Sequence, residues 1–97
     1  MKNQRRKEIS MKYVLVERNG SVIKCIDIYE TYTYAVGETV LRIDSYDKKM
    51  KSDGFKLVDK KDLYELDDST GIGWYRKYLN EYGDISDRIY YLLKLNY

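Results

Sequence analysis

The sequence predicts an α+β fold in which a small antiparallel β-sheet, made of an N-terminal hairpin and further strands, has two short C-terminal helices packed on it. Two β-rich runs near the start of the chain flank Asn19 and Gly20, a dipeptide typical of tight hairpin turns. Further along, small polar residues and glycine interrupt the pattern, and apolar side chains at helical spacing follow. We therefore expect a single domain over residues 11–97, sheet-rich over 11–66 and helical over 72–96.

The hairpin is expected to pair residues 12–17 with residues 21–29, both rich in β-branched and apolar side chains. A two-residue turn at Asn19-Gly20 would place Val16 opposite Ile23, with apolar side chains together on one face. The agreement of several cross-strand pairs supports this pairing more than any single pair does.

The middle of the chain is expected to continue the sheet. Threonine and tyrosine alternate over residues 31–34, which indicates a strand, and residues 39–43 indicate another. Residues 45–53 contain helix formers and predict a short helix before a strand over 55–58. A long hairpin turning at Asp53-Gly54 stays open as the alternative.

The C-terminal part is expected to be helical. Residues 67–71 resemble a hinge, because they are small, polar and end in glycine. Apolar residues at spacings of three and four then predict helices over 73–82 and 87–95. Ile89 and Leu92 are expected to face inward from the second helix.

The composition argues against catalysis. Histidine is absent and there is one cysteine, which excludes Ser-His-Asp and Cys-His arrangements and imidazole metal ligands. The acidic pairs Asp67-Asp68 and Asp59 with Asp62 are typical of solvated turns, so we expect no metal site, no cofactor and no enzymatic activity. Cys25 lies in an apolar run and is expected to be a small buried hydrophobe.

Targeting signals and charge point to a cytoplasmic protein with an uneven surface. No unbroken apolar stretch approaches the ~20 residues that cross a bilayer, and no signal-peptide pattern is present. Residues 1–26 carry seven basic and two acidic side chains, whereas residues 27–68 carry seven basic and eleven acidic ones. Residues 1–10 are polar and aperiodic, and predict a flexible basic arm.

Tyrosine supplies the main functional hypothesis, because twelve of the 97 residues are tyrosine. Its ring and hydroxyl suit protein interfaces, and so many rings cannot all be buried in a small core. Tyr29, Glu30, Tyr32 and Tyr34 combine rings with acidic charge at the border of the acidic middle region. We expect these four residues to bind a protein partner that offers a basic groove, such as a nucleic-acid-processing enzyme.

The bias toward lysine, aspartate, asparagine, isoleucine and tyrosine, without proline, resembles accessory proteins of AT-rich phages and mobile elements. The likeness is one of composition and involves no motif. It implies an inhibitor that blocks a bacterial defence nuclease, in the broad manner of anti-CRISPR proteins.

Nucleic-acid binding is the alternative function. Basic side chains near the N-terminus would contact phosphates while exposed tyrosines stack on bases. These basic residues are Lys2, Arg5, Arg6, Lys7 and Lys12. No zinc-finger spacing or ribonucleoprotein pattern accompanies them, and the sequence leaves the partner's identity and the oligomeric state open.

Overall fold

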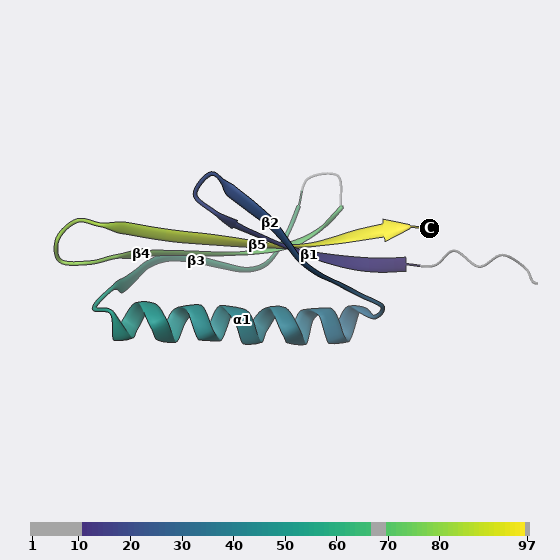
Figure 1. Cartoon of the computed structure of the whole chain (residues 1–97), viewed down its shortest axis with the longest axis horizontal. Coiled ribbons are helices and arrows are strands. Elements are labelled where there is room, and N and C mark those ends of the chain that lie inside the picture. The colour runs from purple at the N-terminus through teal and green to yellow at the C-terminus, as the bar shows by residue number, and fades with distance from the viewer. Residues whose placement is uncertain (1–10, 67–69, 97) are drawn as a thin grey trace, which may run out of the picture.

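The computed structural model describes residues 11–66 and 70–96, which form five strands and one helix. Their order is β1 (Met11–Asn19), β2 (Val22–Tyr29), α1 (Tyr32–Ser52), β3 (Lys56–Glu65), β4 (Gly71–Leu79) and β5 (Ile85–Asn96) (Figure 1). The strands form one antiparallel sheet in the order β2-β1-β5-β4-β3, and α1 lies along one of its faces (Figure 1). The predicted basic arm, residues 1–10, lies outside the described residues. Within the described part, no helix is long and apolar enough to cross a membrane.

The predicted N-terminal hairpin is present as β1 and β2, but its register differs from the expected one. The turn consists of Gly20, with a φ of 63°, and Ser21, so it comes one residue later than predicted. Val16 consequently pairs with Cys25 instead of Ile23. A bulge midway along the pair then shifts the register once more, as an extra residue in one strand does.

Helix α1 occupies the stretch where two strands were predicted. Thr31 caps its N-terminus, because the side-chain hydroxyl accepts a hydrogen bond from the Tyr34 backbone N–H at 3.3 Å. Lys49 and Lys51 in the last turn complement the negative end of the helix dipole. The buried side chains recur every three or four residues and make one stripe toward the sheet. They are Ala35, Thr39, Ile43, Tyr46 and Met50.

The predicted strands over residues 31–34 and 39–43 are therefore wrong. Capping by Thr31 and the apolar stripe outweigh the local β preference of alternating threonine and tyrosine. The helix predicted over residues 45–53 is present as the C-terminal part of α1, and the alternative hairpin is not.

The two predicted C-terminal helices are also wrong, because this part of the chain forms β4 and β5. In β4 the side chains alternate, with Trp74, Arg76 and Tyr78 buried and the residues between them more exposed. β5 pairs with β1 on one side and β4 on the other, so it is the central strand of the sheet. β5 has apolar side chains on both of its faces, with Tyr90 and Leu92 on one and Ile89, Tyr91 and Leu93 on the other. Spacings of three and four therefore arise without a helix.

Two apolar clusters hold α1 on the sheet. The larger one contains Leu15, Tyr29, Ala35, Ile43, Trp74, Tyr90 and Leu92. The smaller one contains Tyr46, Met50 and Tyr78, with Phe55 packed against it. β1, β2, β4 and β5 thus contribute to one helix-facing layer. The predicted inward position of Leu92 holds although its element is a strand, whereas Ile89 points to the opposite face.

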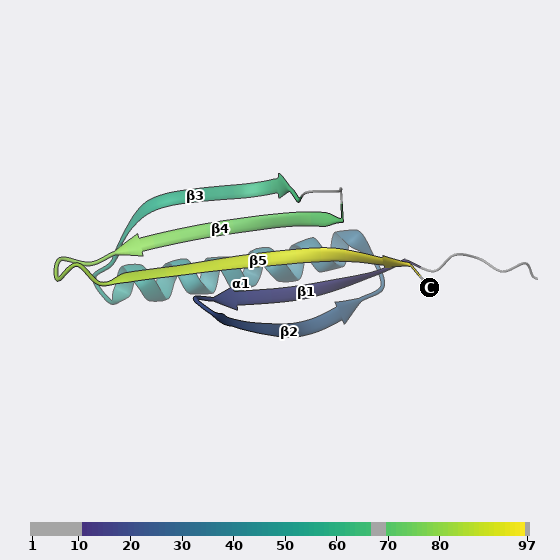
Figure 2. The same ribbon diagram turned by 90° about the horizontal axis from the view of Figure 1, so that it is seen from above.

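The opposite face of the sheet is not covered by any described element, and Figure 2 looks onto it. Because side chains alternate along a strand, the neighbours of the helix-facing residues point toward this side. We call it the open face. Its apolar members include Val14, Val16, Ile23, Cys25, Ile28, Tyr64, Tyr75, Leu79, Ile85, Ile89, Tyr91 and Leu93, and its charged members include Arg18, Asp59, Lys61, Lys77 and Asp87.

Candidate functional site

Four tyrosines gather where β1 and β2 meet the first turn of α1. Tyr13 and Tyr29 are cross-strand partners, and both contribute to the helix-facing core. Tyr32 packs edge-on against Tyr13, with 5.7 Å between the ring centroids, and Tyr34 packs edge-on against Tyr29 at 5.6 Å. Such edge-to-face contacts add to the stabilisation from burial and restrict the rings. We call these four residues the tyrosine cluster.

The cluster contains three of the four residues predicted to bind a protein, but they do not play equal parts. Tyr29 is only 6% exposed, and burial, assisted by the charge of Asp27, raises the pKa of its hydroxyl. Tyr32 and Tyr34 remain 46% and 61% exposed. Glu30, the fourth predicted residue, lies beside them with an exposed side chain that forms an ion pair with Lys12.

The predicted strand over residues 31–34 would point Tyr32 and Tyr34 to the same face. In α1 the direction turns by about 100° per residue, so side chains two apart diverge widely. Each ring consequently rests on a different tyrosine.

The residues of the alternative nucleic-acid site are only partly described. Lys12 lies near the start of β1 and forms an ion pair with Glu30, which brings it to the tyrosine cluster. Lys2, Arg5, Arg6 and Lys7 lie outside the described residues. The described residues therefore bring together the acidic and aromatic set, with Lys12 beside it.

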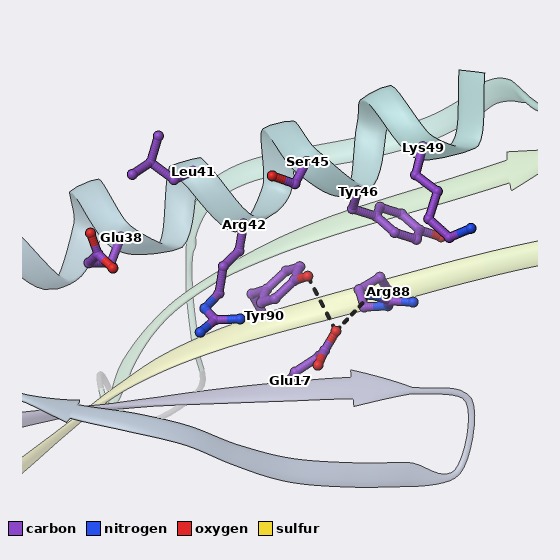
Figure 3. Close-up of a pocket in the computed structure, with 9 residues that line it drawn as sticks. All are labelled: Glu17, Glu38, Leu41, Arg42, Ser45, Tyr46, Lys49, Arg88 and Tyr90. Atoms are coloured by element: carbon purple, nitrogen blue, oxygen red, sulfur yellow. Dashed lines mark hydrogen bonds and ion pairs between the residues drawn. The ribbon is translucent and has the colours of Figure 1, made fainter. Parts of the chain in front are cut away.

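A groove of about 440 Å³ lies between α1 and the strands β1 and β5 (Figure 3). Glu17 is its centre, because its Oε2 accepts hydrogen bonds from Arg88 Nη1 at 2.7 Å and from the Tyr90 hydroxyl at 3.3 Å. The Arg88 guanidinium lies 4.3 Å from the centroid of the Tyr46 ring, within cation–π range. Glu17 and Arg88 thus bind each other, and the contact of Arg88 with Tyr46 links the sheet to the helix.

A second charged network fastens α1 to the other half of the sheet. Arg76 on β4 is 8% exposed and donates to Asp62 at 2.7 Å and to Asp47 at 3.3 Å. Asp47 also accepts a hydrogen bond from the Tyr78 hydroxyl at 2.5 Å. Burial is the main cause that raises the pKa of Tyr78, and the bond to Asp47 adds to it. We assign this network a structural role, since its members satisfy one another.

The titratable groups with shifted pKa values in the described part of the chain are tyrosines and arginines. Every one of these shifts is upward and therefore away from neutral pH. Groups of this kind do not exchange protons readily near pH 7. The described residues also contain no cluster of three or more cysteine or acidic side chains that could hold a metal ion. Asp67-Asp68 lies outside them, and Asp62 serves Arg76.

The open face is the feature that sequence reasoning missed. Tyr64 on β3 lies across Gly73 on β4, so close that a methyl group on Gly73 would come within 2.7 Å of the ring. The Lys61 Nζ lies 5.7 Å from the centre of the same ring. Tyr91 on β5 is the next side chain in this row. A glycine opposite an aromatic residue is the one signal in the sequence that could have indicated this contact.

The expected burial of Cys25 is wrong, because Cys25 is exposed on β2. Ile23 and Ile28 on the same strand are 64% and 51% exposed. Large apolar patches of this kind on a protein surface mark interaction sites.

In comparisons with known proteins, no family model, no curated protein and no solved structure matches this chain.

Proposed function

We propose that the protein is a non-enzymatic, cytoplasmic binding module that recognises a protein partner through its tyrosine cluster. One observation carries the proposal: Tyr32 and Tyr34 are largely exposed, yet each ring is held edge-on by a second tyrosine beneath it. A ring already fixed in the free protein loses little conformational entropy on binding. Exposed, preorganised aromatic rings are typical anchors of protein interfaces.

Charge around the cluster favours a partner with basic character. Glu30 has an exposed carboxylate there, and Asp27 and Glu38 lie on the adjoining strand and helix. Acidic side chains beside aromatic anchors speed association with a basic surface and fix its orientation. Grooves that hold nucleic acid have such a surface.

The partner that fits this chemistry best is a nucleic-acid-processing enzyme, and the resemblance in composition to phage accessory proteins points to a bacterial defence nuclease. Binding in its groove would block access of the nucleic acid, so inhibition needs no catalytic group on this chain. The alternative, direct binding of nucleic acid, predicts a different ligand for the same protein.

The experiment begins with capture of the partner from a bacterial lysate, with and without nuclease digestion. A partner retained after digestion supports protein binding, whereas loss of the bound material on digestion supports the nucleic-acid alternative. The captured protein is then purified, and its affinity for each variant is measured by calorimetry.

Tyr32→Ala and Tyr34→Ala should each weaken binding by about 30-fold, the effect of losing an interface anchor worth about 2 kcal/mol. Glu30→Lys should slow association and reverse its salt dependence. Tyr82→Ala is the matched control, because Tyr82 is 81% exposed in the turn between β4 and β5, away from the cluster. Equal losses for Tyr82→Ala, or unchanged affinity for both cluster variants, would contradict the proposal.

A further inference from the structure

The open face leaves a large apolar surface on the molecule that the proposed function does not use. The tyrosine cluster lies on the helix-facing side of the sheet, and the open face lies on the other side. Antiparallel sheets often expose one face, but that face is then polar, with hydrophobic and polar side chains in alternation. Here β1 and β5 carry apolar side chains on both faces, so the second face also requires an explanation.

We propose that the open face is the interface between two copies of this chain, packed sheet against sheet. Two antiparallel sheets commonly pack in this way, with their apolar side chains interdigitated in one layer. A homodimer related by a two-fold axis uses the same patch twice, so a single patch on one chain is sufficient.

The size of the face meets the requirement of a specific dimer. Five strands at about 4.8 Å spacing, with about four rows of outward side chains on the longer ones, give a face of roughly 600 Å². Two such faces would bury roughly 1,200 Å² together, the lower end of standard protein interfaces. The surface is therefore large enough for a reversible dimer.

The charges of the face favour a second copy over a ligand of one sign. Arg18, Lys61 and Lys77 contribute three positive charges, and Asp59 and Asp87 contribute two negative charges. In the register of the sheet, Lys77 lies between Asp59 and Asp87. A nucleic-acid site needs a uniformly positive surface, whereas a face of mixed sign can complement a copy of itself.

Within this chain, the segment of residues 1–10 is another candidate to cover the open face. It is polar and carries four basic side chains, so it offers little apolar surface to cover isoleucine, valine and tyrosine. The face is thus better matched to a copy of itself than to this segment.

Light scattering after size-exclusion chromatography tests the proposal. The full chain at about 100 µM should have the mass of a dimer, and the mass should fall toward that of one chain on dilution. Ile23→Lys and Ile28→Lys place a charge on two exposed apolar positions of the face and should each shift the dimer–monomer midpoint by tenfold or more in concentration. Leu41→Lys is the matched control, because Leu41 is 62% exposed on α1 and should leave the midpoint unchanged.

The rate of chemical labelling at Cys25 supplies a second measurement, which would not change if the dimer formed through another surface. Cys25 is the only cysteine of the chain and is exposed on the open face, so a maleimide should label it in the monomer. Labelling of the wild-type protein should slow as concentration rises, in proportion to the monomer fraction, and should stay fast in Ile23→Lys.

Three results would overturn the proposal: a wild-type monomer at about 100 µM, a dimer that survives both isoleucine substitutions, or a dimer in which Cys25 labelling stays fast. Circular dichroism of each lysine variant shows whether it is folded. An isoleucine variant that is folded and monomeric supports the interface.

Discussion

Gly73 offers a sharp test of the packing on the open face. The structure predicts that Gly73→Ala destabilises the protein when Tyr64 is present and stabilises it when Tyr64 is replaced by alanine. A methyl group built on Gly73 would lie 2.7 to 2.9 Å from three atoms of the Tyr64 side chain. These atoms are at the end of a flexible side chain, so in Gly73→Ala the ring moves away and the backbone stays in place. We expect a loss of stability, because the displaced ring gives up its cover of the sheet.

The magnitude follows from the area of the ring. Tyr64 is half-buried, and a buried tyrosine removes about 150 to 250 Å² from water, so its contact with the sheet is worth up to about 2 kcal/mol. Replacing glycine by alanine in a compatible strand stabilises by about 0.4 to 1 kcal/mol. Gly73→Ala should therefore destabilise the protein by about 1 kcal/mol. In a Tyr64→Ala background the same change should instead stabilise it by about 0.5 kcal/mol.

Urea unfolding of the wild type, the two single variants and the double variant measures this coupling. Tyr64→Phe serves as a control, because it keeps the ring and should retain most of the coupling. If Gly73→Ala has the same effect with and without Tyr64, the ring does not lie across β4 and the packing described here is wrong.

Three further predictions concern the side of the sheet that faces the helix. Leu92→Ala should cost about 2 to 5 kcal/mol in urea unfolding, since Leu92 is 1% exposed, whereas Ile89→Ala on the open face should cost less than about 2 kcal/mol. Asp47→Ala should cost about 1 to 3 kcal/mol, because the buried Tyr78 hydroxyl would lose its acceptor, and Asp47→Asn should recover part of this loss. Burial raises the pKa values of Tyr78 and Tyr90, so the folded state keeps protons that the unfolded state releases. Stability should therefore be constant up to about pH 9 and fall above about pH 10, by up to 1.4 kcal/mol per pH unit for each such tyrosine, as urea midpoints at pH 8, 10 and 11 would measure.

The N-terminal hairpin was predictable because its signal is local. Glycine near the tip of two β-rich runs indicates a turn within a few residues, whatever the rest of the chain does. Its register was not predictable in the same way. The bulge between Leu15 and Val16 places Tyr13 and Tyr29 together on the helix side. The position of such a bulge depends on how the whole layer packs.

The errors over the rest of the chain have one physical cause. Assigning helices and strands from the spacing of apolar residues assumes that each element buries one apolar face and exposes a polar one. In α1 the inward stripe includes Ala35 and Thr39, which are small or polar, while the apolar Leu41 is exposed. In β5 both faces carry apolar side chains, so strict alternation disappears and a helical spacing can be fitted to it. The enrichment of β4 and β5 in tyrosine and isoleucine favours strands and was the better guide.

These errors in secondary structure also limited the prediction of the candidate site. The number of tyrosines indicated that some rings would be exposed but not which ones. Tyr32 and Tyr34 are among the exposed ones. Their support by Tyr13 and Tyr29 depends on the start of α1 and on the hairpin register, neither of which the sequence revealed. The open face could not be predicted because residues 73–82 and 87–95 were assigned to helices instead of strands.

The two surfaces lie on opposite sides of the sheet, and this arrangement connects the two proposals. A dimer formed through the open face leaves both tyrosine clusters exposed, so it presents two binding sites to a partner. Two linked sites bind an immobilised partner more tightly than one, because the second contact is made at high effective concentration. Ile23→Lys should therefore keep the wild-type affinity on a sparsely coated surface and dissociate faster than the wild type from a densely coated one. Tyr34→Ala should weaken binding on both surfaces, since it changes the site itself. If Ile23→Lys lost affinity equally on both, the open face would belong to the partner-binding site, and the two surfaces would not act independently.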